Sequence, residues 1–216
     1  MINIVRQRVK EIEIEILLFY QDVKNQQKNV ILAIEKNDKE LLLLVAKREQ
    51  KINQKYNRIF KNTVYDLAKY SLFGSYLRKI LAYSYISNEL EKIANHICGV
   101  SLFLLNKKLL SPEKVFLMNF LNKSLNAFIK VEKLFFLKDV KILLKFLRNT
   151  SIKLNFEEFF DNLKKIISNH SSSSQYPFNQ CFRSLQRIFD HLKNIVEYLL
   201  LIQSFIEFKE YKNNKL

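Results

Sequence analysis

The sequence predicts an all-α fold of six long helices, arranged as two tandem copies of one three-helix unit. Three observations lead to this prediction. The 216 residues include only 2 glycines and 2 prolines, apolar residues recur at helical spacing along nearly the whole chain, and one polar motif occurs twice. A β-rich chain of this length needs many turn residues, so long helices with few connections are favoured.

The first half of the chain divides into three helical stretches. The first is expected to end at Asn37, Asp38 is expected to be the N-cap of the second, and Gly74 marks the turn before the third. In each stretch apolar residues recur at steps of three, four or seven, as on one buried helix face, and the third stretch alternates four and three throughout. They are Ile12, Ile16, Phe19, Val23, Val30 and Ile34, then Leu41, Val45, Ile52 and Ile59, then Ile86, Leu90, Ile93, Ile97, Val100 and Leu104.

The second half repeats this order. Ser111 and Pro112 open the fourth helix as cap and first-turn residue, and Lys138 and Asp139 separate it from the fifth. The polar stretch 169–177 is expected to be a loop before the last helix. Apolar residues of that helix again share one face: Leu185, Ile188, Leu192, Ile195, Leu199, Ile202 and Ile206.

Two octapeptides show that the halves are copies. Residues 90–97 read LEKIANHI and residues 185–192 read LQRIFDHL, and only the Ala94/Phe189 pair is chemically dissimilar. Apolar positions of any two heptad helices can be aligned, so the shared polar positions carry the evidence: Glu/Gln, Asn/Asp and His/His. We therefore expect one repeat over residues 1–110 and a second over residues 111–216.

The formal net charge of +15 permits more than one class of partner. Basic proteins bind nucleic acid or anionic membrane surfaces, and this alternative stays open. Lysine, however, far outnumbers arginine and is spread along every predicted helix. That distribution favours a solvated lysine-rich surface.

Neither a membrane span nor a signal peptide is expected. The most apolar stretches, 41–45 and 198–202, are far shorter than a bilayer requires, and charges follow the N-terminus closely. Cys98 and Cys181 lack metal-ligand spacing. They are expected to be reduced, buried thiols of a cytoplasmic protein.

No catalytic constellation is recognisable in the sequence. Two glycines cannot build a phosphate-binding loop, and no nucleophile–base pair is apparent. His96 and His191 each precede an apolar residue of the buried face, Ile97 and Leu192. Because neither has a second ligand at i, i+4, hydrogen-bonded structural imidazoles are favoured over ligands or catalysts.

Three polar pairs at i, i+4 are the candidates for metal binding. This spacing stacks two oxygen-bearing side chains on one helix face, where they could hold a cation. Each pair has one acid and one amide: Glu49 with Asn53, Glu91 with Asn95, and Asp190 with Gln186. From these residues alone, ordinary surface polarity is favoured, and a metal-binding helical bundle stays open as an alternative.

Two segments resemble a known family signature. Residues 75–80 (SYLRKI) with 86–97 (ISNELEKIANHI) resemble the PhoU signature, roughly D-L-R-x-I followed by D-L-E-R-I-G-D-H-A. Residues 185–192 resemble its second occurrence, and Asp38, Glu49 and Ile52 fall where the family has its middle-helix acidic motif. The resemblance covers nearly the whole chain.

The resemblance implies a fold and a role. PhoU-like proteins are two three-helix bundles side by side, and are cytoplasmic accessory proteins of phosphate transport, generally without enzymatic activity. It implies negative regulation of phosphate uptake and of the phosphate-starvation response, through the ATPase subunit of a phosphate ABC transporter or a sensor histidine kinase. It also implies a homodimer, no catalytic residues and no nucleic-acid partner.

Some family members bind metal clusters through E-x-x-x-D pairs, and this chain departs from that pattern. Asn95 stands where the family has Asp, Gln186 where it has Glu, and the fifth helix offers only Asn149 and Thr150. A divalent or iron-type ion is therefore expected to bind more weakly than in the family. Its ligands would be Glu49, Glu91 and Asp190, and the first bundle keeps more of the acids.

Overall fold

The computed structural model describes residues 2–107, 109, 111–137, 139–148 and 172–213. The described residues form eight helices and no strand, which confirms the all-α prediction. The helices are α1 (Ile2–Lys36), α2 (Lys39–Ala46), α3 (Glu49–Lys69), α4 (Gly74–Asn106), α5 (Ser111–Phe136), α6 (Val140–Arg148), α8 (Ser172–Gln203) and α9 (Phe205–Asn213).

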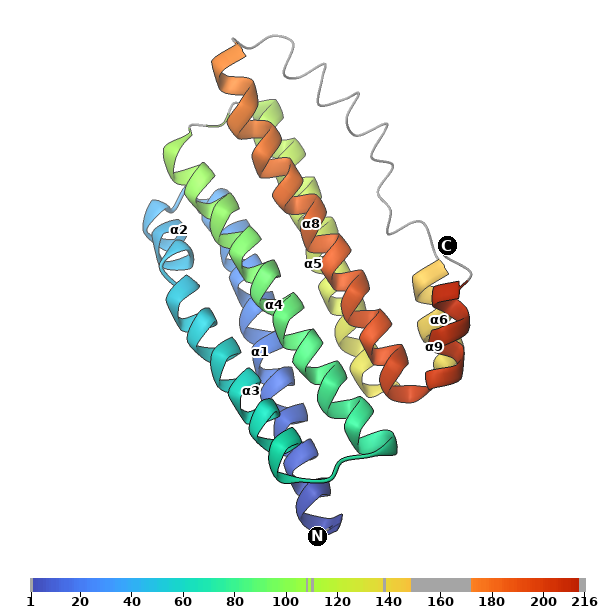
Figure 1. Cartoon of the computed structure of the whole chain (residues 1–216). Coiled ribbons are helices and arrows are strands. Elements are labelled where there is room, and N and C mark those ends of the chain that lie inside the picture. Colours follow the sequence, from blue (N-terminus) through green and yellow to red (C-terminus); the bar gives the residue numbers. More distant parts are fainter. Residues whose placement is uncertain (1, 108, 110, 138, 149–171, 214–216) are drawn as a thin grey trace.

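The long helices lie side by side, with α4 between the α1/α3 pair and α8 (Figure 1). α4 and α8 run in opposite directions and form the most extensive contact between described helices. The predicted apolar faces belong to one continuous hydrophobic core that draws on both halves of the chain, with Leu41 partly buried at its edge and the Ile206 side chain outside the described part. The division into repeats at residue 110 stays a prediction.

Several predicted boundaries are confirmed. The Asp38 side chain caps α2 by accepting a hydrogen bond from the Leu41 backbone N–H at 2.9 Å. α5 begins at Ser111, and Gly74 begins α4 with a φ of +61°, a left-handed conformation that glycine adopts without strain. Asp139 accepts from the Lys141 N–H at 2.8 Å just before α6, while Lys138 lies outside the described residues.

The predicted second helix is in fact broken at Lys47 and Arg48. Both residues keep α-like φ but have ψ near −10°, and the Arg48 N–H bonds the carbonyl of Val45 at 3.1 Å, a tighter 3₁₀-type bond. α4 supplies partners for the carbonyl groups of α2: Ser101 Oγ donates to Leu42 at 2.7 Å, and Cys98 Sγ donates to Val45 at 3.4 Å. Side chains of α4 thus replace part of the helix's own hydrogen bonding.

Two predictions about the last helix are corrected. Residues 172–177, expected in a loop, are the first turns of α8, and residues 169–171 lie outside the described part. The helix also stops at Gln203, so Ile206 belongs to the separate α9. α9 returns to α8, where Tyr211 and Lys212 contact the buried carboxylate of Glu197. α9 thus supplies two side-chain partners to the buried Glu197.

Buried polar contacts join α1 to α5, across the two halves. The Tyr20 hydroxyl donates to the backbone carbonyl of Phe128 at 2.7 Å, and both side chains are fully buried. Gln27 Nε2 donates to Ser124 Oγ at 2.6 Å. Because each contact pairs a buried polar group, the register of α1 against α5 is fixed.

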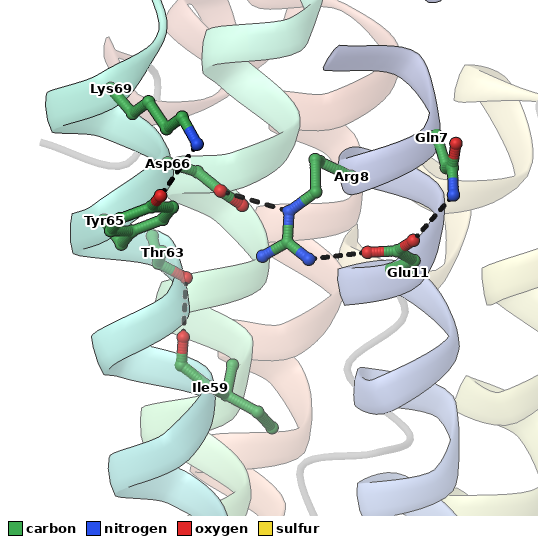
Figure 2. Close-up of polar contacts among 8 residues, drawn as sticks. All are labelled: Gln7, Arg8, Glu11, Ile59, Thr63, Tyr65, Asp66 and Lys69. Atoms are coloured by element: carbon green, nitrogen blue, oxygen red, sulfur yellow. Dashed lines mark hydrogen bonds and ion pairs between the residues drawn. The ribbon is translucent and has the colours of Figure 1, made fainter. Parts of the chain in front are cut away.

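At the other end of α1, a charged contact joins it to α3 (Figure 2). Arg8 Nε donates to Asp66 Oδ1 at 3.2 Å, and Arg8 also contacts Glu11 of its own helix at 2.6 Å. Asp66 is 0% exposed, whereas the Arg8 side chain is 30% exposed. The partly exposed Arg8 is therefore the cationic partner of the buried Asp66 carboxylate.

In the described part of the chain, none of the helices has a stretch long and apolar enough to cross a membrane. Cys98 and Cys181 are both buried and unpaired, as predicted. Burial, aided by the nearby charge of Glu49, raises the pKa of the Cys98 thiol to about 11, and burial raises the pKa of Cys181 to about 12. Both cysteines are therefore protonated, unreactive thiols at neutral pH.

Candidate functional site

The first predicted polar pairs lie on α3 and α4. Glu49 is the exposed first residue of α3, and Asn53 follows one turn later with a buried Oδ1 that has no partner among the described residues. On α4, Asn95 Nδ2 donates to Glu91 Oε1 at 2.6 Å. The amide therefore occupies one oxygen of the carboxylate that would have bound a cation.

The third pair lies on α8. Asp190 is exposed and has an oxygen 3.8 Å from an Arg187 nitrogen, one turn earlier on the same helix. Gln186 is half-buried, while Asn149 and Thr150 lie outside the described residues. The arrangement around Asp190 is that of an exposed surface carboxylate with a loose cation partner.

These side chains do not form the cluster that the family resemblance implies. Within the described ranges, no three acidic, histidine or cysteine side chains converge closely enough to hold a metal ion. Multinuclear sites need several such ligands. The described donor set therefore does not fit a metal cluster, and binding of a single ion by Glu49, Glu91 or Asp190 stays a prediction.

Asn95→Asp tests the amide replacement directly. It removes the hydrogen bond to Glu91 and places two carboxylates at i, i+4, so without metal the free energy of unfolding should fall by about 1 kcal/mol. Manganese or zinc should then raise the melting temperature of the variant more than that of the wild type. Thermal denaturation with and without metal measures both effects, with Asn57→Asp on the exposed face of α3 as control. Equal metal responses in all three proteins would contradict this interpretation.

The two aligned histidines meet at the α4–α8 interface. The rings of His96 and His191 stack with centroids 5.5 Å apart and an interplanar angle of 22°. Each precedes an apolar residue of its helix's buried face, so the antiparallel helices bring the equivalent residues together. The contact therefore lies between α4 of the first half and α8 of the second half.

A buried carboxylate of α4 completes this group. Glu89 is 4% exposed, and its Oε2 accepts hydrogen bonds from His191 Nδ1 at 2.7 Å and Asn194 Nδ2 at 2.9 Å. Lys92 Nζ lies 3.8 Å from its other oxygen. An ionised carboxylate only accepts, so the imidazole proton of His191 is on Nδ1. The hydrogen bond predicted for the His191 imidazole is therefore present.

Opposing effects set the pKa of Glu89. Burial raises it, but the hydrogen bonds from His191 and Asn194, with the nearby positive charge, outweigh burial and hold the pKa below its ordinary value. Burial, together with the nearby His191 and Arg187, lowers the pKa of His96 to about 4. At neutral pH the interface thus holds an anionic Glu89 and a neutral His96.

The protein should therefore lose stability as the pH falls from 7 to 4. Unfolded His96 takes up a proton near its ordinary pKa of about 6.5, whereas folded His96 stays neutral until about 4. Glu89 acts in the same direction at the lower end, because its folded pKa is depressed. With solvent screening of the half-buried ring, the contribution of His96 is about 1–2 kcal/mol.

Urea denaturation at several pH values between 7 and 4 measures this loss. His96→Asn should flatten the pH dependence, because it removes the titrating group whose protonation the fold resists. A slope that is identical in the wild type and the variant would refute the assignment to His96.

Sequence reasoning missed Glu89 and Asn194. The hydrogen-bond partner of Glu89 lies 102 residues away, so no local spacing predicts its burial. A comparison of the two copies gives one signal that could have identified Glu89. Aligning residue 90 with residue 185 places Ser184 opposite Glu89, so an acid next to the buried face occurs in only one copy.

Comparison with known proteins agrees with this architecture. Residues 16–102 match the model of the PhoU domain family. The structure resembles the crystal structure of the phosphate transport system regulatory protein PhoU from Streptococcus pneumoniae. The TM-score is 0.78 and the identity 21%, over 93% of this chain and 97% of that chain.

A second solved structure gives the same result. PhoU from Pseudomonas aeruginosa matches with a TM-score of 0.81 and 20% identity, over 91% of this chain and 97% of that chain. No curated protein sequence matches the chain. The match to the family model covers residues 16–102, and the fold of the chain is that of the two PhoU structures over more than nine-tenths of its length.

Proposed function

We propose that this protein is a regulator of phosphate transport that restrains phosphate uptake. The observation that carries the proposal is the PhoU fold over more than nine-tenths of the chain, in two solved relatives that are themselves PhoU proteins. One of these relatives is described as a phosphate transport system regulatory protein. The PhoU-domain match to residues 16–102 supports the same role.

The proposed mechanism is protein contact rather than catalysis. In the cytoplasm the helical body docks on the ATPase subunit of a phosphate ABC transporter or on a sensor histidine kinase, as a homodimer. A docked protein shifts a conformational equilibrium only if it binds one state more tightly. A tenfold preference for the resting state corresponds to about 1.4 kcal/mol and shifts the ratio of resting to active transporter by up to about tenfold.

The outer face of α3 is the surface that we propose for this contact. Phe60, Val64 and Tyr65 lie within two turns and are 45%, 48% and 54% exposed. Three large apolar side chains grouped on one exposed face are typical of protein contact sites. Arg58 and Lys61 are exposed beside them, so the complementary surface is expected to be apolar with acidic residues at its edge.

Affinity capture at native expression level tests the contact. The tagged wild-type protein should retain the transporter's ATPase subunit or the sensor kinase. Phe60→Ser with Val64→Ser should lose most of this partner, because the apolar anchors are removed without disturbing the core. Val115→Ser on α5 is the matched control, since Val115 is also exposed and apolar but lies on another helix.

Two outcomes would count against the proposal. Capture of neither partner by the wild type would contradict the proposed mechanism. Capture of nucleic acid, with an affinity that falls steeply as salt rises, would favour the alternative of a basic nucleic-acid-binding protein.

A further inference from the structure

A pocket of about 640 Å³ opens where the two halves of the chain join. α1 ends and α2 begins on one side, and α4 ends and α5 begins on the other, at the upper end of Figure 1. We call it the junction pocket. Its volume is in the range of pockets that hold small organic ligands. The described residues that line it include none from the three polar pairs and none from the histidine contact.

The floor of the junction pocket is apolar. It consists of side chains from three helices and the α4–α5 connection: Ala33, Ile34, Leu42, Leu104, Leu105 and Leu109. Four of these residues, Ala33, Ile34, Leu42 and Leu104, belong to the buried core, so the floor is held in place by packing below it. A rigid apolar floor favours a ligand with a flat or apolar part.

The rim of the pocket is polar and basic. It carries Lys39, Lys107 and Lys114 together with Asn37 and Asn106, and no acidic residue is among its lining side chains. The three lysines come from separate segments: the first turn of α2, the end of α4 and the first turn of α5. The positive charge at the rim is therefore assembled by the fold, and does not come from a series of lysines along one helix.

The three lysines differ in how their charge is compensated. Lys107 is paired with the buried Glu113 at 3.1 Å, and its Nζ lies 4.3 Å from the ring centroid of Phe178. Lys114 Nζ donates to the neutral Asn37 Oδ1 at 3.1 Å. Among the described residues neither Lys39 nor Lys114 has an acidic partner. Two positive charges therefore remain available at the rim.

The turn beside these lysines is the C-terminal cap of α1. Asn37 has a φ of 53°, the only positive φ of a non-glycine residue in the described chain. The Asp38 N–H bonds the carbonyl of Ala33 at 2.9 Å, as in the left-handed caps in which helices often end. The cap turns the Asn37 side chain toward Lys114 of the other half.

We propose that the junction pocket binds a phosphate-bearing small molecule with an aromatic or apolar portion, of the nucleotide class. Its phosphate would lie against Lys39 and Lys114, and its base on the leucine floor. A lysine ammonium is a strong point-charge partner for phosphate. The ligand would contact the α1–α2 turn and α5 at once, and so bind the two halves at their junction. This inference goes beyond the proposed function and does not depend on it.

Calorimetric titration of the purified full chain tests the proposal, at about 0.15 M salt where screening suppresses unspecific attraction. The probes are ATP and inorganic phosphate without magnesium. ATP should bind saturably and at least about tenfold more tightly than inorganic phosphate, because only ATP uses the apolar floor. Lys39→Gln with Lys114→Gln should weaken ATP binding by about tenfold or more.

Two further variants make the test specific. Lys10→Gln with Lys130→Gln removes the same charge at exposed positions outside the pocket and should change the affinity by less than about twofold. Leu105→Ser should weaken ATP binding but leave phosphate binding unchanged. The proposal is overturned if ATP does not bind saturably, if both lysine pairs weaken binding equally, or if Leu105→Ser has no effect. Circular dichroism confirms that each variant is folded.

Discussion

Tyr20→Ala is expected to lower the free energy of unfolding by about 3–5 kcal/mol, because it combines a core cavity with a lost buried hydrogen bond. The ring is fully buried between the two halves and packs edge-on against Phe128 and Phe135, with centroids 5.7 and 5.2 Å away. Removing it leaves a cavity and also removes the hydroxyl that donates to the Phe128 carbonyl at 2.7 Å, in addition to the helix's own hydrogen bonding. Both losses act on the contact between α1 and α5.

Tyr20→Phe separates the two losses. It keeps the ring and removes only the hydroxyl, so about 1 kcal/mol should be lost, the net contribution of one buried hydrogen bond. Denaturant unfolding of the three proteins gives the values, and Phe73→Ala serves as control because Phe73 is 80% exposed. The control should stay within about 0.5 kcal/mol of the wild type. A Tyr20→Ala protein as stable as the control would contradict the observed packing of α1 on α5.

The second large effect is expected for Arg8→Ala, with a loss of about 2–4 kcal/mol. Asp66 is fully buried, its Oδ1 depends on Arg8, and its Oδ2 has no hydrogen-bond partner among the described residues (Figure 2). Removing the guanidinium leaves a buried negative charge uncompensated, which costs more than a surface ion pair contributes. The loss is measured by denaturant unfolding at pH 7.

The double variant Arg8→Ala with Asp66→Asn distinguishes this explanation from lost packing. Replacing the carboxylate with an amide removes the uncompensated charge, so the double variant should be more stable than Arg8→Ala alone. Lost packing of the Arg8 side chain would leave both equally unstable. That equality would show that Arg8 acts through its hydrocarbon stem rather than through its charge.

Features that depend on a few neighbouring residues could be predicted from the sequence. The Asp38 cap, the start of α5 at Ser111 and the turn at Gly74 were all identifiable, because each follows from the chemistry of the residue itself. The buried faces were predictable for the same reason, since helical spacing alone determines which residues share a side.

Features that depend on distant partners could not be predicted. The break at Lys47 and Arg48 goes with donors from Ser101 and Cys98, more than 50 residues away. The end of α8 before Ser204 lets α9 reach the buried Glu197. Neither partner leaves a signal in the local sequence.

The candidate sites show the same division. The sequence identified His96 and His191 through the repeat, and the structure places them in contact. It did not identify Glu89, which joins His191 across the interface, nor the junction pocket, whose lysines come from three separate segments. Charges that meet only after folding do not appear as a motif.

Phosphate uptake in the source cell is the most direct test of the central proposal, that this chain with a PhoU fold restrains phosphate transport. The initial rate of radiolabelled phosphate uptake is compared in cells with the chain, without it, and with it restored, all grown in abundant phosphate. We predict faster uptake without the chain and a return to the original rate on restoration. Equal uptake in the three strains, with the transporter present in equal amount, would contradict the claim.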